Sequence, residues 1–526
     1  MTVELPGLTV EPAPPAALPP PLRTDVAGFI GATRRGPIGK PVRVESLSGY
    51  RDVFGDLDPA AATSYAVRGY YENGGELAWV TRVAGAETTA TAGWSVADLT
   101  GFDLVVADTT GFDRVTAYQA VATSPGTWAE GGQVTIWYRS GSLTGSAEVD
   151  VRVVIPGETV EVFTRIPVDK IPERLADSHL IRLVPVLGSN GAVAAPGDPA
   201  RRATMTELSL SSRAAAPVPA PGVNDYLAAV AALADQPEVA IVAVPDLGRH
   251  LTDDNSRKEV VSALLSTAAS QLDRLVLLDV PSDQSGKTLT PAGALAWTEA
   301  VLPARSDSAS RRAAAVYYPG LLVPDPLGGL TAPLRTLPPS GHVAGVISRL
   351  DRERGAYITP ANVVLEDAVD LDPALTEAEQ EVVFGNGLNL LRCAPGRGLQ
   401  VWGGRTLDTD SSDISYVAHR RLLHRLVRAV HQVADPLVFD VNGPGLRLNL
   451  VRGVTSVLLA AFRAGALAGS RPQEAFQVVC DDTNNPPGAD PGQVVCDIAV
   501  APAVPMEFIH LRLIVGQQSQ AEVIEA

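Results

Sequence analysis

Residues 223–313 constrain the fold of this chain more than any other stretch, because buried-strand and helix patterns alternate along them. Two continuous apolar runs, VAIVAVPDL and RLVLLDVP, have the composition of strands that are buried on both faces. The helical patterns VNDYLAAVAALAD and SRKEVVSALLSTAASQL come before and between them. Continuous apolar strands separated by helices are typical of a mostly parallel sheet with helices on its faces. We therefore predict an α/β core here.

The stretches before this core differ in character. Residues 24–84 contain a short apolar strand, two helix patterns and a second strand, LAWVTRV, so they begin a packed domain. Residues 86–213 carry short β-like runs that are interrupted by Gly, Ser and Pro about every ten residues, which favours a small β-rich domain. The Pro-rich segment 213–222 has the composition of a linker back to the core.

The C-terminal quarter begins with a basic amphipathic pattern over residues 414–433. Apolar side chains recur on one face at helical spacing, at Tyr416, Leu423, Val427 and Val430. Basic side chains lie opposite this stripe at Arg421, Arg425 and Arg428, and nearer its edge at Arg420. The spacing predicts a helix with one packed face and one basic face.

A second helix is predicted over residues 450–466, ended by Gly465 and Gly469. Its apolar stripe is formed by Leu450, Val454, Val457, Leu458, Ala461 and Phe462. The following run from Phe476 to Cys480 favours a short strand, and DDTNNPPG favours a turn. Two further strands are expected at 494–500 and 507–515, where apolar and polar residues alternate.

Composition argues against several classes of protein. The 59 acidic and 42 basic residues give a net charge of −17, which would repel the phosphates of a nucleic acid. The first 21 residues lack the apolar region of a signal peptide, and no run approaches the roughly 18 apolar residues of a membrane helix. Cys393, Cys480 and Cys496 are interpreted as reduced core residues, because their spacing suits no metal site. We therefore expect a soluble protein made in a reducing cytoplasm.

One loop resembles a phosphate-binding loop but departs from its pattern. PSDQSGKT follows an apolar strand, as such a loop does, and ends with Lys287 and Thr288. Pro281, however, stands where the first glycine is required, and proline has no N–H to donate to phosphate. This departure argues against nucleotide binding.

Two other groups suggest catalysis or metal binding without the required pattern. No G-x-S-x-G elbow surrounds Ser340, and residues two apart, such as Ser340 and His342, do not by themselves form a nucleophile–base pair. Asp367, Asp370 and Asp372 lack the glycine and the closing glutamate of a calcium loop. Structural roles are favoured for the first pair, and a charged helix start for the three aspartates.

Several motifs resemble, in the same order, those of contractile tail sheath proteins. The N-terminal half carries PGLTVEP and the composite FxG…RGP…FG…YAV…YYxNGG…WVxRV. The second half carries AAVYYPGLLVPDP, PPSGHVAGVISRLDRERGAYITPAN, VWGGRTL, FRAGALAG, EAFQVVCDDTNNPP and APAVPMEFIHLRL. The resemblance covers nearly the whole chain and is weakest over 86–213. The family includes the sheaths of phage tails, R-type tailocins and phage-like contractile injection systems.

The resemblance implies a multi-domain α/β fold with extended terminal arms. Its expected parts are an N-terminal arm (1–22), a core sheath domain in two pieces (23–85 and 214–398), an inserted β-rich outer domain (86–213), a C-terminal domain (399–505) and a C-terminal arm (506–526). In the family, the arms add strands to sheets of other subunits. That exchange would involve Leu8, Val10, Phe508, His510 and Arg512.

The resemblance also implies a structural subunit rather than an enzyme, with no cofactor and no metal. Sheath subunits stack as hexameric rings around an inner tube, and contraction triggered by the baseplate drives the tube through a target envelope. The expected partners are further copies of the chain, the inner tube protein, and baseplate and terminator or cap proteins, without nucleic acid or membrane insertion. Contact with the tube would fall on Arg420, Arg421, Arg425 and Arg428, or on Arg452 and Arg463.

Other interpretations remain open at this point. The sheath could belong to a phage virion tail rather than to an injection system, and it would be assembled in the bacterial cytoplasm in either case. An enzyme on an α/β scaffold would use Ser340 and His342 or the Lys287 loop. A monomeric binding module with disordered tails is the third possibility.

Overall fold

The computed structural model of the 526-residue chain describes most of its residues. These are 23–85, 106–107, 117–139, 148–167, 170–185, 207–211, 218–283, 285–408, 415–486, 492–503, 509–516 and 519–525. The chain divides into two compact units, one of residues 24–421 and one of residues 422–526 with the N-terminal residues up to 23.

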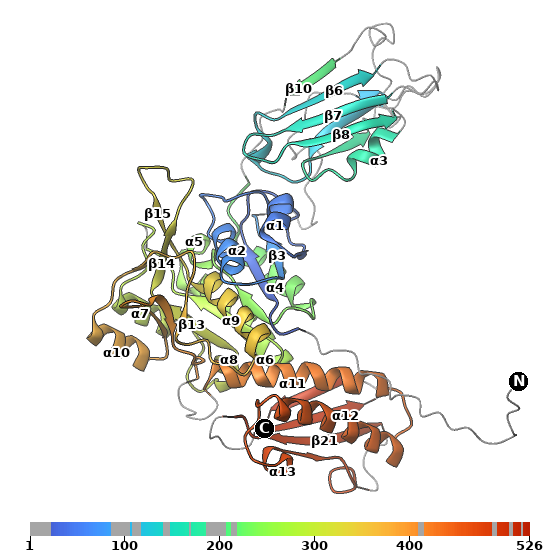
Figure 1. The fold of residues 1–526 in the computed structure, drawn as a ribbon, viewed down its shortest axis with the longest axis vertical. Coiled ribbons are helices and arrows are strands. Elements are labelled where there is room, and N and C mark those ends of the chain that lie inside the picture. The colour runs from blue at the N-terminus through green and yellow to red at the C-terminus, as the bar shows by residue number, and fades with distance from the viewer. Residues whose placement is uncertain are drawn as a thin grey trace, which may run out of the picture. The chain divides into compact units, whose positions relative to one another are not determined.

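A nine-stranded sheet that includes β3 and β13 forms the centre of the first unit (Figure 1). Its strand order is β16-β19-β18-β13-β12-β11-β1-β3-β2. Neighbouring strands from β18 to β3 run parallel, whereas β16, β19 and β2 pair antiparallel. The strands span β1 Ala27–Gly31, β2 Val42–Val44, β3 Ala78–Arg82, β11 Ile241–Ala243, β12 Leu275–Asp279, β13 Ala314–Tyr318, β16 Val363–Val364, β18 Asn389–Ala394 and β19 Gly398–Trp402.

Helices cover both faces of this sheet, because its central strands are apolar on both sides. One hydrophobic cluster joins the sheet to α2 and α9, and a second joins its other face to α4, α6 and α7. The helices of this unit are α1 Leu47–Phe54, α2 Thr63–Glu72, α3 Ile171–Leu175, α4 Val223–Ala234, α5 Leu247–His250, α6 Asp254–Gln271, α7 Pro291–Val301, α8 Ser308–Arg312, α9 Ser340–Arg354 and α10 Glu377–Gly385. The predicted α/β core is confirmed.

The region between β3 and α4 is rich in strands, as the sequence predicts. It holds a three-stranded sheet, β4-β5-β9, and a four-stranded sheet, β10-β6-β7-β8. These strands span β4 Val106–Ala107, β5 Ala117–Ala122, β6 Gln133–Arg139, β7 Glu148–Val154, β8 Glu161–Pro167, β9 Ile181–Pro185 and β10 Glu207–Ser211. A separate cluster that includes Trp128, Ile136 and Val151 forms the core of this region.

A buried arginine ties this β-rich region to the core sheet. The guanidinium of Arg35 donates to the Glu158 carboxylate at 3.1 Å and to the carbonyl oxygen of His179 at 3.2 Å. The same group also donates to the carbonyl oxygens of Val53 and Arg51, at the end of α1. Because Arg35 is only 3% exposed, each lost partner would leave a buried donor without an acceptor.

A small antiparallel sheet, β15-β14-β17, completes the first unit. Its strands span β14 Gly320–Pro324, β15 Leu334–Leu337 and β17 Asp370–Asp372. The aspartates expected at a helix start lie instead before and within β17, and α10 begins only at Glu377. The helix start was misplaced because the capping pair that sets it, Thr376 and Glu379, follows the aspartates.

The C-terminal unit contains a four-stranded antiparallel sheet, β20-β21-β22-β23. Its strands span β20 Phe476–Val479, β21 Gln493–Val500, β22 Ile509–Gly516 and β23 Ser519–Glu525, and its helices include α12 Pro444–Arg463 and α13 Pro472–Ala475. Helix α11, Val417–Ala434, contains the boundary between the two units.

Helix α12 begins six residues before the predicted start, because Gly443 and Pro444 occupy the N-cap and first positions. Its buried side chains recur every four residues, at Leu446, Leu450, Val454 and Leu458. By length and mean hydropathy, 1.3, α12 also meets the requirements for a membrane-crossing helix, with 17% of that window buried. Core helices of soluble proteins pass the same test, so one such helix is weak evidence of a membrane span.

Candidate functional site

The sheet reverses its strand order at β1, and the carboxyl ends of β1 and β11 border a crevice there. From β1 the chain builds the sheet in one direction through β3, and later in the other direction through β11, β12 and β13. Open α/β sheets bind ligands at such a reversal of strand order, outside the carboxyl ends of the strands. The chain therefore has the topology of a ligand-binding fold.

The carboxylate of Asp246 fills this crevice. Its Oδ1 accepts from the backbone N–H of Ala62 at 2.5 Å, and its Oδ2 accepts from the N–H of Thr63 at 3.2 Å and the hydroxyl of Thr63 at 2.6 Å. Oδ2 also accepts from the N–H of Ala32, just beyond β1, at 3.1 Å. A carboxylate at the N-terminus of α2 takes the place that a ligand phosphate takes in nucleotide-binding folds.

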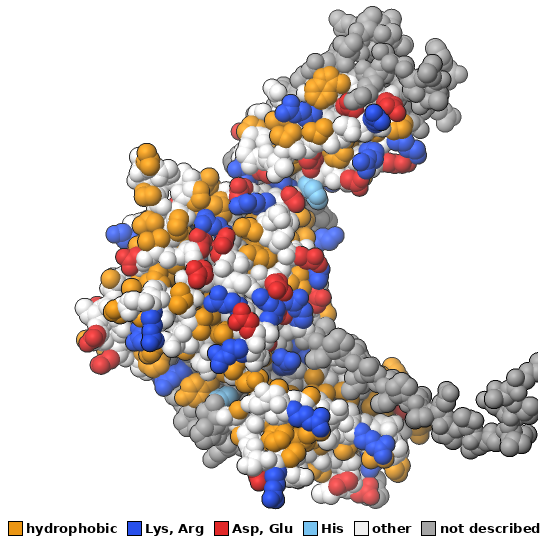
Figure 2. Space-filling model, in the orientation of Figure 1, with side chains coloured by type: hydrophobic (Ala, Val, Ile, Leu, Met, Phe, Trp, Pro, Cys, Tyr) orange, Lys and Arg blue, Asp and Glu red, His pale blue; other side chains and the backbone are white. Residues whose placement is uncertain are grey.

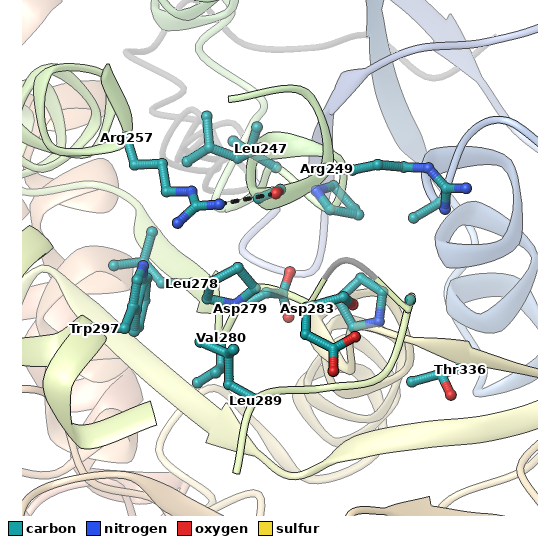
Figure 3. A pocket seen from close by; sticks show the side chains of 18 of the residues that line it. Leu247, Arg249, Arg257, Leu278, Asp279, Val280, Asp283, Leu289, Trp297 and Thr336 are labelled. Carbon is teal, nitrogen blue, oxygen red and sulfur yellow. Dashed lines mark hydrogen bonds between the residues drawn. The ribbon is translucent and has the colours of Figure 1, made fainter. Parts of the chain in front are cut away.

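A pocket of about 490 Å³ lies beside this crevice, at the ends of β11 and β12 (Figure 3). Leu278, Leu289 and Trp297 supply apolar walls, and Asp279 is a titratable group within it. Burial raises the pKa of Asp279 to about 7. Its Oδ1 accepts from the backbone N–H of Ser340 at 3.0 Å, whereas Oδ2 has no hydrogen-bond partner among the described residues. Ser340 contacts this carboxylate through its backbone N–H and not through its hydroxyl, so the two side chains do not form a catalytic pair.

The Lys287 loop is closed by its own side chains. The carboxylate of Asp283 accepts from the N–H and hydroxyl of Ser285, at 2.8 and 2.6 Å, and from the N–H of Lys287 at 3.1 Å. These backbone donors are the groups that would cradle a phosphate in a nucleotide-binding loop. The loop therefore keeps its anion-binding groups occupied, as the substitution of Pro281 for glycine suggested.

Ser340 and His342 lie in the first turn of α9 but do not face one another. Among the described residues, neither the Ser340 hydroxyl nor the His342 ring nitrogens have a hydrogen-bond partner. Burial lowers the pKa of His342 to about 4. The imidazole packs against α2, where a Cβ at Gly69 would lie 2.3 Å from its Cε1. The glycine at position 69 thus makes room for the buried imidazole, and His342 is not hydrogen-bonded to the Ser340 hydroxyl as the base of a catalytic pair would be.

The three aspartates have separate partners rather than a shared cation. Asp367 pairs with Arg68 at 2.5 Å, and Asp372 accepts from the backbone N–H of Thr288 at 3.0 Å. Asp370 caps its own strand by accepting from the N–H of the next residue. In the part of the chain that the structure describes, no group of three His, Cys, Asp or Glu side chains could hold a metal ion.

The prediction that α11 has an exposed basic face is wrong. Arg420 and Arg421 are each 2% exposed and Arg428 is 3% exposed, so of the predicted set only Arg425 is exposed. Arg421 donates to the Asp351 carboxylate at 2.6 Å and to the carbonyl oxygen of Thr24 at 2.8 Å.

Arg428 has a similar buried setting in the C-terminal unit, where it donates to the carbonyl oxygen of Arg23 at 2.8 Å. Helical spacing placed these arginines on a polar face, but it could not reveal partners that lie 397 and 405 residues away along the chain. Buried arginines with satisfied donors hold the fold and are not available to a partner protein.

The second basic candidate, on α12, lies at the surface. Arg452 and Arg463 are exposed, on the side of the helix opposite Leu450 and Leu458. Leu448 on the same exposed side is 48% accessible. The helix therefore presents basic and apolar groups together, away from its own core.

The connection between α11 and α12 carries two further exposed apolar side chains. Phe439 is 85% exposed and Val441 is 83% exposed. Phe439 also has a φ of 75°, a conformation that non-glycine residues seldom adopt. Figure 2 shows hydrophobic and basic side chains next to one another on the C-terminal unit. Large exposed apolar groups beside charged ones are typical of protein interaction surfaces.

The residues predicted for strand exchange are only partly described. Leu8, Val10 and Phe508 lie outside the described residues. His510 and Arg512 lie in β22, opposite Ala499 and Asp497 of β21. Because β22 also pairs with β23, it has a partner strand on each side within one chain, and β20 and β23 are the edges among the described strands.

The turn after β20 depends on residues that the sequence marked only as a turn. Asn485 donates to the carbonyl oxygen of Val495 at 2.8 Å and accepts from its N–H at 2.7 Å. Asn484 donates to the carbonyl oxygen of Val479 at 2.6 Å. The cluster of Asp and Asn residues in the sequence was the available signal, because these side chains bind nearby backbone groups.

Cys393, interpreted as a core residue, is exposed on β18.

Comparisons with known proteins agree with the sequence motifs. The family model described as "Phage tail sheath protein central domain" matches residues 220–407. The tail sheath protein of Vibrio phage KVP40 (isolate Vibrio parahaemolyticus/Japan/Matsuzaki/1991) is 26% identical over 184 residues, which are 34% of this chain and about a quarter, 26%, of that protein.

Solved structures show the same fold. The sheath tail protein of Listeria innocua has a TM-score of 0.64 at 13% identity, covering 94% of this chain and 96% of that one. The helical sheath of the anti-feeding prophage in its contracted state has a TM-score of 0.54 at 19% identity, covering 97% and 98%. The family model and the phage relative confirm the resemblance to tail sheath proteins, and the solved structures show that the fold is the same.

Proposed function

From the phage tail sheath central domain that this chain carries, we propose that the whole chain is the structural subunit of a contractile sheath. The observation that carries the proposal is the family match over residues 220–407, which contain six of the nine strands of the core sheet. Subunits would stack as hexameric rings around an inner tube. Contraction would drive that tube through a target envelope, as the family resemblance implies.

Strand exchange between subunits would connect these rings. The N-terminal arm with Leu8 and Val10, and the C-terminal arm with Phe508, His510 and Arg512, would add strands to the small sheet of other copies. The register of β22 against β21 supports this role, because the same backbone pairing can be made by an identical strand from another chain. In a free subunit, β22 would pair with β21 of its own chain.

Contact with the inner tube would be made by α12 and by Arg425. Arg452 and Arg463 are exposed on the same side of α12 as the apolar Leu448, and Phe439, before α12, is exposed in a strained conformation. Charged contacts suit a grip that must later be released, because many weak ion pairs are strong collectively and separate reversibly. The buried Arg420, Arg421 and Arg428 are not part of this proposal.

We further propose that the chain has no catalytic role and uses no cofactor. Asp246 fills the crevice at the strand reversal, and Asp283 occupies the donors of the Lys287 loop. Contraction would draw its free energy from new contacts between subunits, summed over many copies. The subunit would be assembled in the bacterial cytoplasm, and would end in a virion tail or in a released injection particle.

Electron microscopy of particles from cells that express the whole gene cluster tests the proposal. We expect striated cylinders with helical symmetry for the wild-type chain. Removal of residues 2–20 should leave a folded subunit, with unchanged circular dichroism, that forms no cylinders. Discrete globular particles and a monomeric purified chain would instead refute the sheath proposal.

Two matched variants separate the tube contact from general damage. Arg463→Glu reverses the charge at the last position of α12, and Arg354→Glu reverses the charge at the last position of α9. We expect the α12 variant to yield fewer tube-filled sheaths than Arg354→Glu. Equal numbers for both variants would remove α12 from the tube contact. Lys287→Ala should assemble normally, whereas an enzyme that used this loop would lose its activity.

A further inference from the structure

Two cysteines face one another across the first two strands of the C-terminal sheet. Val479 of β20 pairs with Asp497 of β21, so the same register one step further brings Cys480 opposite Cys496. Cys480 is 8% exposed and Cys496 is fully buried, and both are free thiols. The third cysteine, Cys393, is exposed in the other unit.

The ladder places the two thiols at a position that suits a covalent bond. The N–H of Ala501 donates to the carbonyl oxygen of Ala475, which makes that pair a hydrogen-bonded one. Hydrogen-bonded and non-hydrogen-bonded pairs alternate, so Cys480 and Cys496, five steps along, form a non-hydrogen-bonded pair. In such pairs the Cα atoms are about 4.5 Å apart. Disulfides span Cα separations of roughly 4.4–6.8 Å.

The surroundings of the pair distinguish one sulfur from the other. A hydrogen bond with the Cys496 thiol lowers the pKa of Cys480. Burial opposes this shift, whereas the positive charge of Arg447 also lowers the pKa. The same hydrogen bond, together with burial, raises the pKa of Cys496. The thiolate is the reactive form of cysteine. Cys480 therefore ionises first, and Cys496 is positioned as the second thiol.

We propose that Cys480 and Cys496 form a reversible disulfide when the protein meets an oxidising environment. The Cys480 thiolate attacks one sulfur of an oxidised small-molecule disulfide such as oxidised glutathione, and one glutathione thiolate leaves. Cys496 then loses its proton and attacks the Cys480 sulfur of this mixed disulfide, which releases the second glutathione. Two protein thiols are oxidised and one glutathione disulfide is reduced to two thiols.

The bond would fix the part of the sheet that receives the terminal strand. It closes the chain over residues 481–495, where Asn485 already hydrogen-bonds to the backbone of Val495. Its far end lies on β21, the strand that pairs with β22 along its whole length. One consequence rests on the proposed function: a sheath released from a reducing cytoplasm would gain this link outside the cell. The chemistry itself does not depend on assembly.

Mass spectrometry of the purified full-length chain tests the proposal directly. The chain carries Cys393→Ser, so that the exposed thiol cannot form links between molecules, and is equilibrated in glutathione buffers of increasing oxidised fraction. Free thiols are then alkylated and the chain is digested without reductant. We expect a peptide that links Cys480 to Cys496, and its loss on return to reducing buffer.

Hydrogen exchange supplies a second measurement on the same samples. Closing a loop of about 15 residues should lower the opening equilibrium of β20 and β21 by up to roughly 100-fold. The Cys480→Ser variant in the same background should show no linked peptide and no change in exchange between the two buffers. A chain that acquires only glutathione adducts, or that links only after denaturation, would overturn the proposal. A monomeric but linked chain would refute the sheath function alone.

Discussion

Replacing Asp246 by asparagine should destabilise the first unit, because this carboxylate organises the crevice at the strand reversal. The side chain is fully buried and accepts from three backbone N–H groups and from the Thr63 hydroxyl. An asparagine has the same shape but offers one acceptor oxygen and one NH₂ group. If its oxygen keeps the contacts with Ala32 and Thr63, its NH₂ group faces the N–H of Ala62.

The cost of Asp246→Asn follows from these contacts. A buried donor left without an acceptor costs about 1–3 kcal/mol, and the loss of charge weakens the remaining bonds by about 1 kcal/mol more. We therefore expect the free energy of unfolding to fall by roughly 2–4 kcal/mol. Guanidinium denaturation followed by circular dichroism measures the change. Hydrogen exchange of α2 locates it, because the chain has two units and need not unfold in one step.

Asp283→Asn is the matched control for this variant. Asp283 also accepts from backbone N–H groups and a hydroxyl, but it lies in an exposed loop where water can replace each contact. Its substitution should leave the denaturation midpoint nearly unchanged. The reasoning fails if Asp246→Asn has the midpoint and the α2 exchange of the wild-type chain. Phosphate binding gained by that variant would instead indicate a masked anion site.

Two further predictions concern other buried charges. Arg421→Met leaves the almost fully buried Asp351 carboxylate, 2.6 Å from the Arg421 guanidinium, without its cation, and should lower the free energy of unfolding by about 3–5 kcal/mol in guanidinium denaturation. Adding Asp351→Leu should recover part of this loss. Strictly additive effects of the two substitutions would contradict the pairing. The pKa of Asp279 is raised to about 7, so the folded state holds this proton between about pH 4 and 7 and stability falls as pH rises through that window. Asp279→Asn mimics the protonated acid, so it should exceed the wild-type stability by less than about 2 kcal/mol at pH 5 and by at most about 4 kcal/mol at pH 8, whereas an equal difference at both pH values would show that Asp279 does not titrate there.

The sequence predicted the core because the signals there are local. The continuous apolar runs around Ile241 and Leu275 are buried on both faces only when helices cover both sides of the sheet, and β11 and β12 form at those runs. The first residue of α12 was harder to predict. An apolar stripe gives the helix interior, whereas the start was set by Gly443 and Pro444, outside the stripe.

The contacts that hold the sites together were not predictable in this way. Asp246 reaches Ala32 and Thr63 across 214 and 183 residues of chain, and no periodicity reveals such a pairing. The arginines of α11 were misplaced for the same reason. A charged side chain is assigned to the surface unless its partner is known, and Asp351 could be recognised as a partner of Arg421 only in the folded chain.

The burial of α11 and the exposure of α12 have a consequence for how a sheath could hold and release a tube. A grip that must be reversible needs charges that are hydrated before contact and after it, because removing a paired arginine from the interior would leave a buried carboxylate unpaired. Arg421 fails this requirement, since Asp351 already holds it. Arg452 and Arg463 meet it, because their side of α12 is exposed and the apolar Leu446, opposite them, anchors the helix to its own unit. Release would then cost no change in the fold of the subunit.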